Sequence, residues 1–223
     1  MCHFNLLKTF AIAIVLLVTF TLTACFGGSA SEPTRYYTLA IENINTPSTY
    51  KANGKVQIRK FSVDEAYQKS NIVYRESAYD FMVYDLDLWA SRPEHMITQV
   101  ASEYITRSHL FQSVEIKSSS KPDFEIVGQL DAIEEVDEGN LQFARLALKL
   151  SFRKTENDSI LWENRYDEKL AMSKREPHYM AESTSKLLAK FMEDAIAHIA
   201  ASMPIQQAAA PQVAPQPKEV QAQ

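Results

Sequence analysis

The sequence predicts a single α/β (α+β) domain in which a mixed, mainly antiparallel β-sheet is packed by two amphipathic α-helices. Residues 124–136, 141–154 and 159–170 are three long β-forming runs, and in the second and third every second side chain falls on one face, which predicts the centre of the sheet. Two segments near residues 93–107 and 177–202 carry apolar residues at spacings of three and four, which predicts the helices. A chain of 223 residues is long enough to give one such domain a core.

The three long runs form an antiparallel meander, because turn-forming segments at residues 137–140 and 156–158 divide them. The second run places Ala144, Leu146, Leu148, Leu150 and Phe152 on one face, and the third places Ile160, Trp162, Tyr166 and Leu170 opposite its charged residues. We therefore expect one packed face and one solvated face.

Shorter runs predict further strands at residues 35–41, 55–59 and 111–117. Residues 72–75 and 79–84 predict a hairpin that is aromatic on more than one face. Part of this hairpin is therefore expected to lie beneath a helix or a partner.

Local signals predict where the helices begin and end. Ser91 is expected to cap the first helix, and Pro93 suits its first turn. Pro204 is expected to end the second helix. Residues 204–223 are rich in Gln, Ala and Pro, which favours a disordered tail that is either a solvated end or an arm contacting a partner or the cell wall.

The N-terminus has the composition of a targeting segment. Lys8 precedes an apolar run at residues 10–20, which suits a signal peptide and is shorter than the ~20 residues of a membrane-spanning helix. Leu22-Thr23-Ala24-Cys25 follows and resembles the bacterial lipoprotein box, where cleavage between Ala24 and Cys25 exposes an acylated cysteine. An uncleaved single-span anchor is the alternative. The expected divisions are a lipoprotein signal peptide at 1–24, a lipidated flexible tether at 25–34, the domain at 35–203 and the tail at 204–223.

Cys25 is expected to carry a covalent diacylglycerol and an N-acyl chain, and several chains on one residue hold a protein to a membrane far more firmly than one. Cys2 leaves with the signal peptide, so the body has no cysteine for a disulfide or a thiolate metal site. Cys25 is accordingly an anchor and not a catalytic thiol.

The charge balance argues against a nucleic-acid partner. The whole chain has 23 basic and 28 acidic residues, and removal of Lys8 leaves 22 against 28, a net charge of −6. A nucleic-acid-binding protein needs a basic face to match phosphates.

No pattern of residues indicates catalysis. The histidines of the body, His95, His109, His178 and His198, show no helical pairing, so we expect no metal and no cofactor besides the lipid. Two groups of acidic residues could in principle act as acid/base pairs, but a solvated polar face is favoured for both, since no nucleophile or opposing base accompanies them. These groups are Asp85 with Asp87, and Glu134, Glu135, Asp137 and Glu138. We expect a protein that is not an enzyme.

Aromatic residues are better candidates for a functional contact, since aromatic side chains dominate interface energetics. The candidates for partner contact are Tyr36, Tyr37, Tyr74, Tyr84 and Trp89. For most of them, packing in the core is the favoured interpretation, and an exposed member would be a natural anchor for a protein partner.

Several short motifs follow one another along the chain: the lipobox, Tyr36-Tyr37-Thr38-Leu39, Ile72-Val73-Tyr74-Arg75, Trp89-Ala90 and the helix that begins at Pro93. Their order resembles the ABC-type transport auxiliary lipoproteins, the family of paraquat-inducible protein C. One departure is the acidic stretch before Trp89.

The resemblance implies an outer-membrane lipoprotein on the periplasmic face, partnered by an inner-membrane ABC transporter and an MCE-domain (mammalian-cell-entry) protein in moving lipids between membranes. Phe26 stands where an aspartate would be the usual retention mark, which on this resemblance agrees with passage to the outer membrane. The alternatives are a lipoprotein that activates or scaffolds a cell-wall or envelope-assembly enzyme, and direct carriage of lipid in an apolar groove.

Overall fold

A computed structural model describes residues 32–45, 52–118 and 120–203 of the chain. The chain divides into two units, Met1–Thr34 and Arg35–Gln223, and the fold described below is that of the second. The lipobox, Pro204 and the tail lie outside the described residues, so the interpretations placed on them remain predictions.

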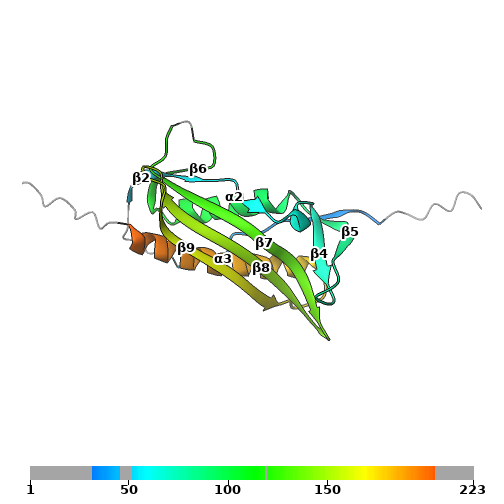
Figure 1. Cartoon of the computed structure of the whole chain (residues 1–223). Coiled ribbons are helices and arrows are strands. Elements are labelled where there is room, and N and C mark those ends of the chain that lie inside the picture. The colour runs from blue at the N-terminus through cyan, green and yellow to red at the C-terminus, as the bar shows by residue number, and fades with distance from the viewer. Residues whose placement is uncertain (1–31, 46–51, 119, 204–223) are drawn as a thin grey trace, which may run out of the picture. The chain divides into compact units, whose positions relative to one another are not determined.

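The second unit contains nine strands, two α-helices and one turn of 3-10 helix among its described residues (Figure 1). They are β1 (Arg35–Tyr37), β2 (Ala52–Ile58), β3 (Ser62–Val63), η2 (Glu65–Tyr67), β4 (Asn71–Arg75), β5 (Met82–Trp89), α2 (Pro93–Arg107), β6 (Phe111–Glu115), β7 (Phe124–Glu138), β8 (Leu141–Lys154), β9 (Ser159–Ala171) and α3 (Pro177–Ser202).

The sheet is organised around β7. One edge of β7 pairs along its length with β8, which pairs in turn with β9, and this is the predicted antiparallel meander. The other edge pairs in succession with three short parallel strands: β2 near Phe124, β3 near Gln129 and β4 near Glu134. Beyond them, β5 and β1 extend the sheet from β4, and β6 extends it from β2. The mixed sheet with two α-helices confirms the predicted fold class.

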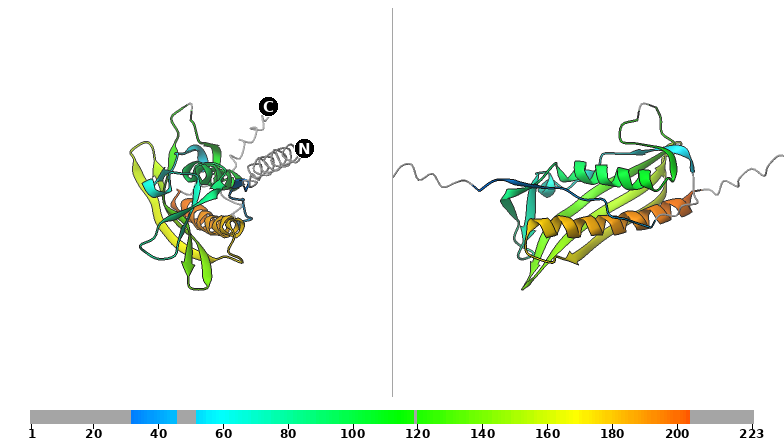
Figure 2. Two further views of the ribbon diagram at one scale, coloured as in Figure 1. Left: turned by 90° about the vertical axis from the view of Figure 1, so that its right-hand side faces the viewer. Right: turned by 180° about the vertical axis from the view of Figure 1, so that it is seen from behind.

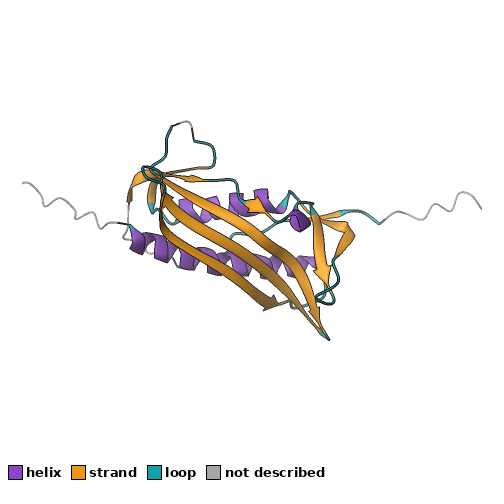
Figure 3. Cartoon of the chain, in the orientation of Figure 1, coloured by secondary structure: helices purple, strands orange, loops and turns teal. Residues whose placement is uncertain are grey.

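Both α-helices cover the same face of the meander (Figure 2). Figure 3 colours helices purple and strands orange and so distinguishes the helical layer from the sheet. The predicted apolar face of β8, Ala144 to Phe152, is at most 1% exposed and packs with the apolar stripe of α3. Alternation along β8 puts Arg145 and Lys149 on the opposite face, which we call the outer face. No helix among the described residues has the length and apolar character needed to span a membrane.

One close approach in this core requires glycine. A Cβ placed on Gly128 of β7 would lie 2.4 Å from the ring of Phe61, which is 2% exposed. The absence of a side chain at Gly128 is what lets this ring lie flat against the strand.

Two local predictions were wrong. The first strand ends at Tyr37 instead of residue 41, because the next backbone N–H groups bond to helices: Ala40 donates to Ser185 Oγ at 3.0 Å and Glu42 to Tyr104 Oη at 2.8 Å. Ser91 does not cap α2; Arg92 occupies the N-cap without a side-chain hydrogen bond, and Pro93 begins the helix as predicted.

The predicted face of Ile160 was also wrong. Phe152 of β8 pairs with Trp162 and the next residue, Arg153, pairs with Ile160, so Leu161 is an extra residue in β9. Such a bulge reverses the alternation. Ile160 therefore shares the outer face with Arg153 and is 58% exposed.

Candidate functional site

Strand β7 carries two consecutive carboxylates with no solvent exposure, Glu134 and Glu135. They point to opposite faces, since Glu134 pairs with Arg145 on the outer face and Glu135 pairs with Ala144 on the packed face. A buried charge is costly unless it is paired and hydrogen-bonded, so the partners of each group define what this region can do.

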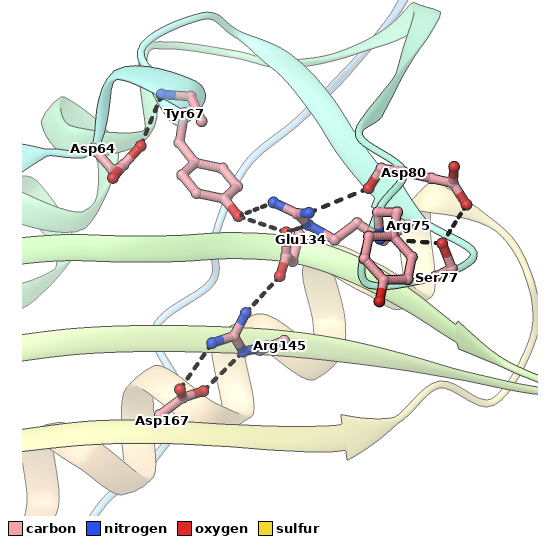
Figure 4. Close-up of polar contacts among 10 residues, drawn as sticks. Asp64, Tyr67, Arg75, Ser77, Asp80, Glu134, Arg145 and Asp167 are labelled. Carbon is pink, nitrogen blue, oxygen red and sulfur yellow. Dashed lines mark hydrogen bonds and ion pairs between the residues drawn. The ribbon is translucent and has the colours of Figure 1, made fainter.

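Glu134 is held by three donors from three other segments (Figure 4). Its Oε2 accepts hydrogen bonds from Tyr67 Oη at 2.5 Å and from Arg75 Nε at 2.6 Å. Its Oε1 accepts from an Arg145 guanidinium nitrogen at 2.7 Å. This carboxylate therefore joins η2, β4 and β8 across the outer face.

The network continues to β9 through Arg145, which also forms a bidentate pair with Asp167 at 2.8 Å for both contacts. These hydrogen bonds lower the pKa of Asp167 and raise that of Arg145. Burial, with the hydrogen bond to Glu134, raises the pKa of Tyr67 to about 12. All three groups consequently keep one protonation state throughout the physiological range.

The same network braces the turn between β4 and β5. Arg75 donates to the Asp80 carbonyl oxygen at 3.2 Å, and its guanidinium lies 4.9 Å from the centre of the Phe81 ring. Phe81 also meets Tyr67 edge-on with ring centres 5.8 Å apart. Within the turn, Ser77 Oγ donates to Asp80 Oδ2 at 2.6 Å. The turn is thus tied both to itself and to the buried carboxylate.

Glu135 is less well satisfied than its neighbour. Tyr84 donates a hydrogen bond to its Oε2 at 3.2 Å, whereas its Oε1 has no hydrogen-bond partner, with Arg175 Nε 4.0 Å away. Arg175 instead pairs closely with Asp137. Burial and the nearby charge of Asp137 raise the pKa of Glu135 to about 6.

A polar groove of about 850 Å³ lies on the outer face beside this network. Glu134 and Arg145 form part of its lining, together with the turn residues Glu76 and Ser77 and, on β9, Lys169. This mostly charged lining does not suit an acyl chain, and the described residues hold no group of three side chains fit to bind a metal ion.

Apolar side chains gather on the hairpin next to this groove. Tyr79 is 97% exposed, Phe81 41% and Val83 40%, and these three make up half of the large exposed hydrophobic residues in the described part of the chain. We call Tyr79, Phe81 and Val83 the hairpin patch. Exposed aromatic residues on a braced turn are a natural protein contact, because the turn backbone loses little conformational freedom on binding.

The five aromatic candidates for partner contact have different environments. Tyr36 is 65% exposed, whereas Trp89 is 1% exposed and belongs to the core. Tyr37 donates a hydrogen bond to Asp87 at 2.9 Å, and Tyr74 packs on Tyr84 with ring centres 4.7 Å apart. Tyr37 and Tyr84 line one smaller pocket at the start of α3. Only Tyr36 is mainly exposed.

The prediction of a solvated acidic face was wrong for three residues. Asp87 is 5% exposed, and Glu134 and Glu135 are fully buried. Arginines from distant segments pair with two of them, Arg35 with Asp87 at 2.8 Å and Arg75 with Glu134 at 2.6 Å. The hairpin patch was missed among the candidate contacts. The signal for it was the aromatic character of both faces of residues 79–84.

The architecture defines an α+β protein whose sheet wraps two helices on one face and presents a braced hairpin. The family model for the ABC-type transport auxiliary lipoprotein component matches residues 37–203, and the chain belongs to this family. Its resemblance to that family, inferred from the sequence, is thus confirmed.

Two solved structures share the fold at low identity. A protein from Xanthomonas campestris described by the DUF330 family model is 13% identical, with a TM-score of 0.67 over 75% of this chain and 96% of that one. A second, described only as an uncharacterized protein, is 12% identical, with a TM-score of 0.62 over 75% of this chain and 99% of that one. No curated protein matches the sequence significantly.

Proposed function

We propose that the protein is a non-enzymatic, lipid-anchored docking component of an ABC-type intermembrane lipid-transport system, held by Cys25 at the periplasmic face of the outer membrane. Its partners are an MCE-domain protein and, through it, the inner-membrane ABC transporter. Membership of the auxiliary lipoprotein family supports a role alongside a transporter. The lipobox ahead of the body supports the anchor.

The observation that carries the docking role is the hairpin patch. Tyr79 and Phe81 stand on a turn that Arg75 and Glu134 hold in place, and Val83 follows on β5. A preformed surface avoids the cost of ordering on binding. The neighbouring charged groove supplies a polar rim, as interfaces commonly have.

A non-catalytic role agrees with the chemistry of the site. The buried carboxylates are bound by arginine and tyrosine, and no serine or threonine nucleophile contacts a histidine base in the hydrogen bonds of the described residues. The network therefore serves to position strands and the hairpin.

Co-purification tests the proposal. The full lipidated protein is captured from detergent-solubilised envelopes, and its companions are compared with those of Phe81→Ser and of the control Ile160→Ser, which alters an exposed residue on β9. We expect the wild type and the control to capture an MCE-domain or ABC-transporter component, and Phe81→Ser to lose it. Capture of a cell-wall enzyme in place of transport components would favour the scaffold alternative and contradict the proposal.

A further inference from the structure

Strand β9 has an open edge. Among the described strands it pairs with β8 alone, although it is 13 residues long. An open strand edge presents unpaired backbone N–H and C=O groups that another strand can bond. A groove of about 390 Å³ runs beside the centre of β9, from Asn164 to Glu168, with Lys190 and Asp194 of α3 on its other side.

The residues whose backbone faces outward can be identified. The Arg165 N–H donates to the side-chain oxygen of Asn164 at 2.9 Å, so it points away from β8. In an antiparallel ladder such outward groups recur at every second residue. The outward set at the centre of β9 is therefore Glu163, Arg165, Asp167 and Lys169.

The side chains of this outward set are exposed and alternate in charge: negative, positive, negative, positive. A second β9 that runs antiparallel about a twofold axis at Tyr166 places Arg165 opposite Asp167 of the second copy. The same register places Glu163 opposite Lys169 of the second copy. Each pair occurs twice, and in every pair both backbones point toward the new strand, as a hydrogen-bonded pair requires.

The register is specific. Sliding one strand by two residues places only like charges opposite each other, such as Arg165 opposite Arg165 or Asp167 opposite Asp167 of the second copy. Sliding it by four residues leaves only one kind of ion pair, either Glu163 with Arg165 or Asp167 with Lys169. In the central register the inner-facing residues also agree, since Trp162 meets Leu170 of the second copy and both are half-buried in the single chain.

We infer that two copies of this chain associate through β9 in an antiparallel pairing centred on Tyr166, which joins their meanders into one continuous sheet. Charge complementarity along the edge and the groove beside it carry this inference. Within one chain all four residues already have a partner. Glu163 pairs with Lys149 at 2.9 Å, Arg165 with Asp131 at 2.8 Å, Asp167 with Arg145 at 2.8 Å and Lys169 with Glu138 at 2.5 Å, so the second copy extends existing rows of charges. The hydrogen bond from Arg165 to Asn164 is replaced by a bond to the incoming strand.

A charge-swap experiment tests the register. In a dimer of two Glu163→Lys chains, Lys169 of each copy faces a lysine of the other copy, so both attractive pairs become repulsive. In a dimer of two Lys169→Glu chains, Glu163 of each copy faces a glutamate of the other copy. A dimer of one Glu163→Lys chain and one Lys169→Glu chain restores both attractions. Opposed charges across strands contribute modestly, so each single variant should dimerise about tenfold to hundredfold more weakly than the wild type. The equimolar mixture should recover wild-type dimerisation. Masses of the full lipidated proteins in detergent are measured by sedimentation over a range of concentrations.

Two further variants guard against trivial effects. Glu156→Lys makes the same charge change at an exposed position in the turn before β9 and should dimerise like the wild type. Arg165→Pro removes an outward N–H without removing a bond to β8, so it should fold and remain monomeric. Circular dichroism melting verifies folding of each variant. A wild type that stays monomeric, single variants that dimerise normally, or a mixture that fails to recover would each overturn the inference.

Discussion

Replacing Glu135 by glutamine should stabilise the protein at neutral pH and leave its stability at low pH nearly unchanged. The Glu135 carboxylate is fully buried, its Oε1 has no hydrogen-bond partner, and Asp137 lies close to it. An amide of the same shape carries no charge and can donate a hydrogen bond, which an ionised carboxylate cannot. The substitution therefore removes the cost of burying this charge.

The size of the effect follows from the pKa of Glu135, which burial raises from its ordinary 4.5 to about 6. A folded-state pKa above the unfolded value gives a contribution to stability that is complete below about pH 4.5 and is lost as the pH rises through about 6. The loss corresponds to at most about 2 kcal/mol by pH 7.5. Tyr84 and Arg175 face the same group and oppose the rise in its pKa.

Urea unfolding at pH 4.5 and pH 7.5 measures this difference, with both proteins carrying Cys25→Ala so that lipid does not interfere. The free energy of unfolding of Glu135→Gln should exceed that of its parent at pH 7.5 by up to about 2 kcal/mol, and match it at pH 4.5. Glu138→Gln, at an exposed neighbour on the same strand, serves as the control and should not raise the free energy of unfolding at pH 7.5, because it removes an ion pair with Lys169. An equal difference between Glu135→Gln and its parent at the two pH values would refute the reasoning.

Three other predictions concern the anchor, the core and the buried network. Cys25→Ala should move the protein from the membrane to the soluble fraction with its circular dichroism unchanged, and continued membrane fractionation would mean that the anchor lies elsewhere. Gly128→Ala should lower the free energy of unfolding by about 1–3 kcal/mol, because its Cβ would overlap the Phe61 ring, and a neutral result would show that the ring can move aside. Glu134→Ala should cost about 3–5 kcal/mol in urea unfolding because it leaves Arg75 and Arg145 without their shared carboxylate, and a cost below 1 kcal/mol would contradict the structural role of the network.

Long periodic segments were predictable because periodicity reports directly on burial. The meander of β7, β8 and β9 and the helices α2 and α3 appear close to their predicted bounds, since many residues repeat the same signal. The two-residue strand β3 and the single turn η2 were not predicted, because segments this short carry no period.

Burial of the acidic residues could not be predicted from local sequence. Asp87 and Glu134 look like solvated residues in their own strands, and only the fold brings Arg35, Arg75 and Arg145 to them. The face of Ile160 depended on a single extra residue, Leu161, whose effect on the alternation is invisible without the pairing of β8 and β9.

Exposure of the hairpin patch could not be predicted from local sequence either. The hairpin of residues 72–75 and 79–84 was expected to lie partly beneath a helix or partner. Ile72 and Val73 are buried, whereas Tyr79, Phe81 and Val83 are exposed in the single chain. Their exposure, with the bracing by Arg75, is what turns an aromatic run into a candidate docking surface.

The most direct test of the docking role is photo-crosslinking in intact cells. A photoreactive residue is placed at Phe81 of the full lipidated protein and, as the control, at Ile160, which is exposed on β9 instead of the hairpin. The account predicts an adduct at Phe81 that contains an MCE-domain or ABC-transporter component, and no such adduct at Ile160. Adducts of a transport component at Ile160 but not at Phe81, or of a cell-wall enzyme alone at Phe81, would contradict it.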